Sequence, residues 1–171
     1  LSRYLPNRGV WIMNADGTHS VNLTHNVGDD RDGAWGPTVD IAFTSTRNNN
    51  VPLVYLMKLA CPGLEEDCTA ERPRSITMTG TYAPEHSPAW APDGRHLYFS
   101  STRGGTMNLW RVPIDEATGR VLGAPEPLTT PSLWSGNPGL TRDGRHLVFA
   151  SLDWRSTLLR AAFDPVREQL A

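Results

Sequence analysis

The sequence predicts an all-β chain that stacks copies of one four-stranded antiparallel unit. Residues 93–97, Asp-Gly-Arg-His-Leu, return without a gap as residues 143–147, and a repeat of this length indicates a recurring supersecondary unit. The apolar runs are short and are separated by Gly, Pro, Asn and Asp. No segment shows sustained apolar spacing at i, i+3 and i+4. Fifteen glycines and fourteen prolines in 171 residues also indicate many turns.

The clearest copy spans about residues 86–130. Its strands are expected at 88–90, 96–101, 108–112 and 126–129, with a polar loop over most of 114–127. A tight turn is expected at 92–95, because proline presets φ and Asp-Gly tolerates positive φ. Along 96–101, Leu, Phe and Ser alternate with His, Tyr and Ser, so the two sets face opposite sides of the sheet.

The other copies follow this template with defects. A second copy, about 32–79, has strands at 33–35, 41–47, 53–57 and 74–77. A third, about 136–171, has strands at 147–149 and 157–161 and a weaker one at 167–170. Residues 8–25 match only the third and fourth strands. The chain therefore holds about three and a half units, in one domain over residues 1–171.

Residues 87–103 and 11–17 closely resemble the TolB-type β-propeller repeat. The resemblance extends from about residue 8 to 165 and implies a β-propeller of four-stranded antiparallel blades, partial or open, with about three and a half blades present. Residues 112–129 and 154–165 are also similar to propellers of bacterial serine/threonine kinases and winged-helix regulators, where the propeller senses or binds. Propellers host many activities, so the resemblance specifies fold rather than chemistry.

Aromatic residues recur at fixed places in the copies. Trp35 and Trp90 are equivalent, as are Trp11, Tyr55 and Trp110. We expect them to pack between blades, each contributing about 2–3 kcal/mol on burial. A ligand-stacking platform is the alternative.

Four residues are candidates for a binding surface on a rim or loop. Arg47 and Arg103 recur at the end of the second strand. Each forms either a hydrogen bond to a neighbouring loop or a salt bridge between blades, or else it is a rim charge that binds a partner. His86 and Trp134 are the other two candidates.

No pattern for catalysis, a metal or a cofactor is found. His96 and His146 are repeat-determined positions in different blades, without a recurring carboxylate beside them. The acidic run 29–32 lacks a calcium loop's glycine and terminal glutamate, and we expect a solvated loop there. There is no Gly-x-Ser-x-Gly elbow, phosphate loop or kinase signature. We therefore expect a protein that is not an enzyme, although propeller enzymes can assemble sites from separate loops.

Cys61 and Cys68 flank a short insertion. A disulfide between them would imply an oxidising, extracytoplasmic compartment such as the periplasm, whereas two free thiols are the alternative. Asn22-Leu23-Thr24 fits the glycosylation pattern but is better explained as the closing Leu-Thr of a repeat.

Sixteen basic and eighteen acidic residues leave the chain near neutrality, so nucleic acid is a poor candidate partner. No apolar run approaches the roughly 20 residues of a membrane helix. We expect a non-catalytic module that binds or senses a protein or peptide. The alternative is the accessory propeller of a prolyl-oligopeptidase-like or other hydrolase. Three and a half blades cannot close a ring, so we expect the missing blades to come from a longer parent chain or from self-association. The half-blade at residues 8–25 favours the longer parent chain.

Overall fold

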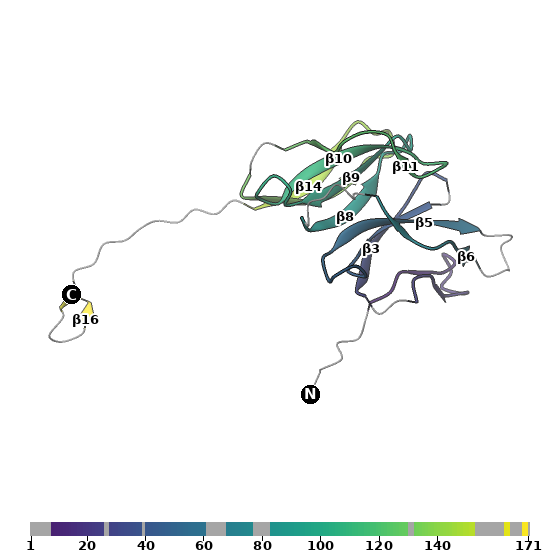
Figure 1. Cartoon of the computed structure of the whole chain (residues 1–171), viewed down its shortest axis with the longest axis horizontal. Helices are drawn as coiled ribbons and strands as arrows, with labels where there is room; N and C mark the ends of the chain where they lie inside the picture. Colours follow the sequence, from purple (N-terminus) through teal and green to yellow (C-terminus); the bar gives the residue numbers. More distant parts are fainter. Residues whose placement is uncertain are drawn as a thin grey trace.

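The computed structural model describes residues 8–25, 28–38, 40–60, 68–76, 83–129 and 132–152, together with the backbone of 163–164 and 169–170. Every regular element in these residues is a β-strand (Figure 1). The all-β prediction is thus confirmed. No helix in the described residues has the length and hydrophobicity needed to cross a membrane.

Two sheets form full four-stranded blades, each with one additional short strand. The first contains β3 (Asp30–Trp35), β4 (Asp40–Ser45), β5 (Leu53–Ala60), β6 (Thr69–Ala70) and β7 (Arg74–Ser75), with β6 and β7 both paired to β5. The second contains β8 (Glu85–Trp90), β9 (His96–Ser101), β10 (Asn108–Asp115), β11 (Arg120–Val121) and β12 (Glu126–Pro127), with β11 and β12 both paired to β10. All strand pairs within them are antiparallel, as the repeat predicts.

Three smaller sheets complete the described strands. They are β1 (Trp11–Ile12) with β2 (Val21–Asn22), β13 (Trp134–Leu140) with β14 (Leu147–Leu152), and β15 (Phe163–Asp164) with β16 (Gln169–Leu170). The strand expected at 157–161 lies outside the described residues. Within the stretch expected to form a weak strand at 167–170, β16 pairs with β15.

The apolar core is divided into two clusters, each between consecutive sheets. Phe43 of β4 packs with Val10 and Leu23 of the half-blade, and Phe99 of β9 packs with Val54 and Leu56 of the preceding blade. Both phenylalanine side chains are fully buried. Blade-to-blade packing therefore carries the hydrophobic stabilisation, as the repeat predicts.

One backbone hydrogen bond recurs at each junction between consecutive sheets. The amides of Asp30, Glu85 and Ser135, at equivalent places in β3, β8 and β13, donate to carbonyls of residues that precede β1, β5 and β10. Their acceptors are Arg8 at 3.1 Å, Pro52 at 2.9 Å and Met107 at 2.8 Å. The half-blade β1–β2 is therefore joined to the next blade by the same bond that joins complete blades.

The segment expected to be a loop at 114–127 instead contains a β-hairpin. Strand β10 continues to Asp115 and pairs with β11. The tip of this hairpin contacts the preceding blade, where the Glu116 carboxylate accepts hydrogen bonds from the Thr38 amide at 2.7 Å and hydroxyl at 2.9 Å. Lys58 and Arg74 donate to carbonyls of Ala117 and Thr118. These contacts explain why a polar sequence with Gly119 forms a hairpin.

The expectation that all the repeat aromatics are buried is wrong for two of them. Trp90 is 7 % exposed, whereas its equivalent Trp35 is 57 % exposed and Trp11 is 58 % exposed. Trp90 packs on the full blade before it. Trp35 follows a sheet whose described residues include only β1 and β2, so less of its face is covered.

Candidate functional site

The inner strands β3, β8 and β13 share a β-bulge near their starts. The register shifts between Arg31 and Ala34, between His86 and Ala89, and between Gly136 and Gly139. At these bulges Asp32, Ser87 and Asn137 adopt φ of 56°, 50° and 55°. Positive φ is uncommon outside glycine, and bulges often re-aim side chains at functional positions.

The three bulge residues form one polar row across three neighbouring sheets. Ser87 Oγ lies 2.8 Å from Asn137 Oδ1 and 3.5 Å from Asp32 Oδ2. The Ser87 amide also lies 3.3 Å from Asp32 Oδ2. Asp32 and Asn137 remain exposed, and Ser87 is half-buried. We call Asp32, Ser87 and Asn137 the inner-strand row.

Hydroxyls of the second strands fix the row in place. Thr44 Oγ1 of β4 accepts the Ser87 amide at 3.1 Å and donates to Asp32 Oδ2 at 3.0 Å. Ser100 Oγ of β9 accepts the Asn137 amide at 3.1 Å. A hydrogen bond from a row amide to a second-strand hydroxyl thus joins neighbouring sheets at two successive junctions, and these bonds hold the row in position.

Charged groups flank one end of the row. Arg31 pairs with Asp29, and its Nε lies 3.8 Å from Asp32 Oδ2. One Arg31 amino group lies 3.3 Å from His86 Nδ1. Burial lowers the pKa of His86, the Arg31 charge lowers it further, and Asp32 opposes both. His86 is therefore kept neutral near pH 7, where it offers one hydrogen-bond donor and one acceptor.

The structure places two of the expected binding residues inside the blades. Arg47 bonds to Asp30 at 3.1 Å, and Arg103 bonds to Glu85. Their side chains are 18 % and 8 % exposed. Each ion pair lies within one blade rather than between blades, and each guanidinium also lies over two aromatic rings. Both arginines therefore pair inside their own blades, whereas the expected salt bridge was one between blades.

The remaining candidates are scattered. His86 lies beside the row, while Trp134 begins β13 and is half-buried. Cys61 lies outside the described residues, so its pairing with the disulfide cysteine Cys68 stays a prediction. The interpretation of 29–32 as a solvated loop is wrong, because β3 begins at Asp30 and Asp30 is 1 % exposed.

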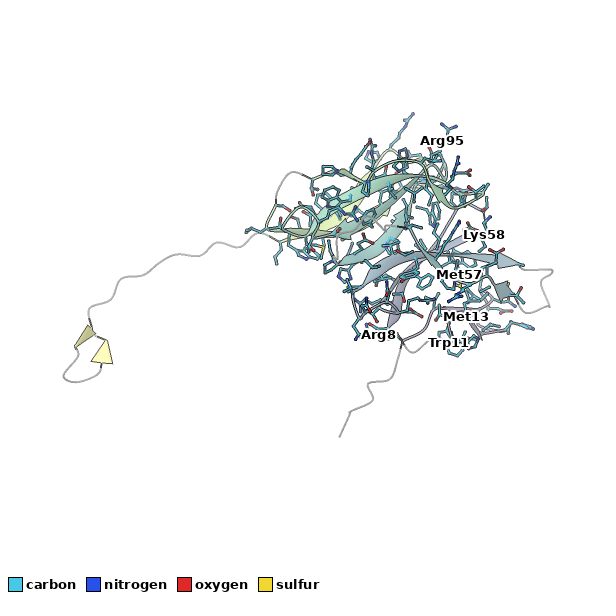
Figure 2. The ribbon with its side chains drawn as sticks, in the orientation of Figure 1. Arg8, Trp11, Met13, Met57, Lys58 and Arg95 are labelled. Carbon is cyan, nitrogen blue, oxygen red and sulfur yellow. The ribbon has the colours of Figure 1, made fainter. Side chains whose placement is uncertain are left out.

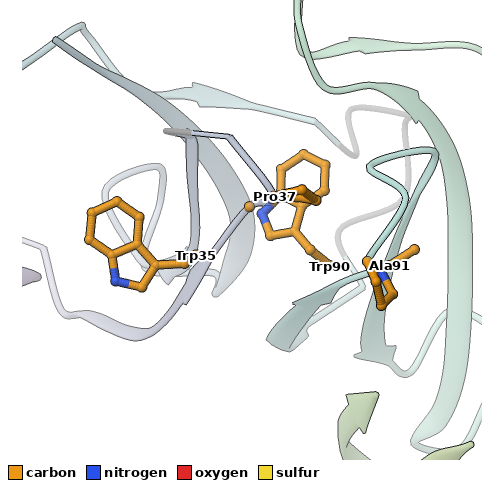
Figure 3. A pocket seen from close by; sticks show the side chains of 6 residues that line it. Trp35, Pro37, Trp90 and Ala91 are labelled. Carbon is orange, nitrogen blue, oxygen red and sulfur yellow. The ribbon is translucent and has the colours of Figure 1, made fainter. Parts of the chain in front are cut away.

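A shallow cleft of about 240 Å³ lies between the two full blades, away from the row. It is lined by Trp35, Gly36, Pro37, Trp90, Ala91 and Pro92. Figure 3 shows Trp90 lying toward Pro37, whereas the Trp35 ring points away from them. None of these six lining residues has an ionisable side chain.

The row presents groups that form hydrogen bonds. Within the described residues the hydrogen bonds of Ser87 go to Asp32, Thr44 and Asn137, whereas the usual partner of a nucleophilic serine is a histidine. The described residues contain no group of three potential metal ligands. What the row offers is an exposed carboxylate and an exposed amide, with the half-buried side chains of Arg31 and His86 beside them.

Sequence reasoning missed Arg31, Asp32, Ser87 and Asn137. The row position holds three different residue types, so it does not stand out as a repeat. A usable signal was a small polar residue directly before glycine or proline in each inner strand: Asp32-Gly33, Ser87-Pro88 and Asn137-Pro138.

Comparison with solved structures identifies the fold. A candidate TolB protein from Agrobacterium tumefaciens matches with a TM-score of 0.64 and 22 % identity, over 85 % of this chain and 46 % of that chain. The fold is a TolB-type β-propeller. TolB from Acinetobacter baumannii matches with a TM-score of 0.42 and 16 % identity, over 95 % of this chain and 47 % of that chain.

Two curated proteins are similar to parts of the chain. The Tol-Pal system protein TolB of Francisella tularensis is 30 % identical over 77 residues, covering 45 % of this chain and 16 % of that protein. An uncharacterised Agrobacterium fabrum protein is 35 % identical over 66 residues, covering 39 % and 20 %. The chain thus spans a fifth or less of these relatives. No family model matches it.

Proposed function

We propose that this chain is a non-catalytic propeller module that binds an extended segment of a protein or peptide at the inner-strand row. The observation that carries the proposal is the row itself: Asp32, Ser87 and Asn137 converge from three blades and stay accessible. Side chains fixed by a rigid scaffold lose little entropy on binding.

The chemistry of the row favours a peptide as its ligand. Asp32 and Asn137 offer acceptors, and Arg31 and the Asn137 amide group offer donors, in a line that crosses successive strands. An extended main chain presents alternating N–H and C=O groups that could pair with such a line.

The proposed setting is the bacterial periplasm. One relative is named as a Tol-Pal system protein, and a Cys61–Cys68 disulfide would need an oxidising compartment. Sensing as part of a longer protein, such as a kinase or winged-helix regulator, belongs to the same proposal.

The test begins with selection of peptides from a displayed library on the full chain, followed by calorimetry. We expect the double variant R31Q/N137A to weaken a selected peptide about tenfold or more, since it removes charge-assisted and neutral hydrogen bonds. The variant R120Q changes an exposed side chain of β11 and should bind as the wild type does. Equal affinities for all three proteins, or cleavage of the peptide, would overturn the proposal.

A further inference from the structure

We propose that Trp134 extends the inner-strand row into a site for proline, so that the bound segment places a proline at the Asn137 end of the row. This inference rests on the function proposed above and names the class of segment that the row would take. Trp134 is half-buried at the start of β13, and Asn137 is exposed three residues later in the same strand.

The Trp134 ring lies against the stretch of backbone that carries Asn137. A Cβ built on Gly136 would lie 2.8 Å from both Cη2 and Cζ2 of Trp134, and 3.3 Å from Ser100 Oγ. The same Ser100 Oγ accepts the Asn137 amide at 3.1 Å. The far edge of the indole and the third member of the row are therefore neighbours.

Glycine at position 136 makes room for this ring. The residues that directly precede the row in the two earlier blades are Arg31 and His86, whose polar side chains lie 3.3 Å apart. In the third blade the equivalent residue has no side chain, and the Trp134 indole covers it. The row is thus flanked by polar groups at two blades and by an aromatic ring at the third.

The groups left free at this end of the row are mainly hydrogen-bond donors. Asn137 Oδ1 already accepts a hydrogen bond from Ser87 Oγ at 2.8 Å, whereas Asn137 Nδ2 donates to no group in the described residues. Trp134 Nε1, which can only donate, has no partner among them either. It remains accessible, unlike the Nε1 atoms of Trp90 and Trp110, which are buried. A ligand must therefore bring acceptors to this end.

Proline matches both the donors and the ring. It has a carbonyl oxygen but no backbone N–H, so it presents acceptors without adding a donor that lacks a partner. Proline also favours an extended polyproline II backbone, which forms no hydrogen bonds within itself. Grooves lined by aromatic side chains are a recurring way of binding such segments. Among extended segments, one with a proline beside Trp134 therefore fits best.

Peptide selection on the full chain tests the inference. A displayed library of short random peptides is selected on the wild type, on Trp134→Ala and on Trp11→Ala, and the recovered peptides are sequenced. We expect proline to be enriched at one position with the wild type and not with Trp134→Ala. The matched control Trp11→Ala removes a tryptophan of β1 that is 58 % exposed, and it should keep the enrichment.

A double-mutant cycle then separates recognition from folding. Replacing the proline of a selected peptide by alanine should weaken binding to the wild type about tenfold, through lost ring packing and a lost hydrogen bond. Trp134→Ala should bind both peptides equally, since the interaction is already removed. Trp134→Phe keeps a ring over Gly136 without Nε1 and should retain only about threefold discrimination. A variant that is merely less stable would bind both peptides less and keep the tenfold ratio.

The outcomes distinguish this inference from the proposed function. Suppose that R31Q/N137A weakens the selected peptides, but that they lack a preferred proline or that Trp134→Ala keeps the tenfold ratio. The row then binds peptides and the inference about Trp134 is wrong. Enrichment of an aromatic residue in place of proline would overturn it as well. If R31Q/N137A leaves binding unchanged, the proposed function fails and this inference fails with it.

Discussion

At the scale of the residue, a buried ion pair is found at equivalent positions in both full blades. Arg47 with Asp30 and Arg103 with Glu85 join the turn after the second strand to the start of the first. Both carboxylates are almost completely buried. Removing one partner of such a pair leaves an uncompensated charge, which costs far more than the pair contributes.

Arg103→Ala should therefore lower the free energy of unfolding by about 3 kcal/mol or more. Arg111→Ala removes the exposed pair with Glu126, and its loss should be about 1 kcal/mol or less. Urea denaturation followed by tryptophan fluorescence measures both. Equal losses would show that the Glu85 carboxylate is not effectively buried.

Asp40 adds a pH dependence to the stability. It is 2 % exposed, and its Oδ2 has no hydrogen-bond partner within the described residues. Burial raises its pKa, Lys58 opposes the rise and Glu116 adds to it. A carboxyl whose pKa is raised by folding favours the folded state at low pH. This contribution is lost as the pH rises from 3.8, the ordinary pKa of the group, through the raised pKa of Asp40 in the folded protein.

Asp40→Asn should therefore stabilise the protein at pH 7, because it removes the cost of a buried charge. The gain should shrink as the pH falls through the raised pKa of Asp40, and it should be gone below about 4, where the unfolded chain is protonated as well. Thermal unfolding at several pH values measures the difference. A gain that stays constant with pH would show that ionisation of Asp40 is not its cause.

At the scale of the element, the β10–β11 hairpin acts as a strap onto the preceding blade. Glu116 at its tip is 9 % exposed and bonds to Thr38. It also packs under Gly94, where an added Cβ would lie 2.6 Å from Glu116 Oε2. Gly144 has the same φ, but its added Cβ would meet nothing closer than 3.7 Å.

This pair of glycines isolates the contribution of the strap. Gly144→Ala should cost about 1 kcal/mol from the left-handed backbone alone. Gly94→Ala should cost that amount and about 1–2 kcal/mol more, since Glu116 must move away from Thr38. Paired urea denaturation curves measure the difference. If the two variants lose the same stability, the contact of Glu116 with Thr38 does not contribute to the free energy of unfolding.

The elements were predictable where the repeat is strong. The run 96–101 forms β9, and burial alternates from His96 to Phe99, because similarity to 146–151 marks the position and period two marks the orientation. The hairpin 114–121 was missed, because its stability depends on contacts with Thr38, Lys58 and Arg74 that are distant in sequence. The row was missed because its three residues share a backbone conformation rather than an identity.

At the scale of the whole molecule, apolar side chains are exposed at both ends of the series of sheets. Trp11, Met13 and Trp35 are more than half exposed at one end, and Val148 and Leu152 are exposed at the other. Trp11 and Met13 lie far from Arg95, at the opposite side of the view in Figure 2. In a propeller such faces pack against neighbouring blades, so we propose that further blades, from a parent chain or a second copy, cover them.

Sedimentation of the purified 171-residue chain tests this proposal. Uncovered blade faces should make it associate as its concentration rises, and Trp35→Ser with Val148→Ser should reduce the association. A chain that stays monomeric and well dispersed at high concentration would contradict it.

The central claim is that the inner-strand row binds a protein segment. Amide hydrogen exchange on the full chain, with and without a peptide selected from the displayed library, tests it most directly. Slowed exchange in residues 30–33, 86–89 and 136–139 is the expected result, because the ligand would cover all three bulges at once. Unchanged exchange in these three segments, with protection confined to other parts of the chain, would contradict the account.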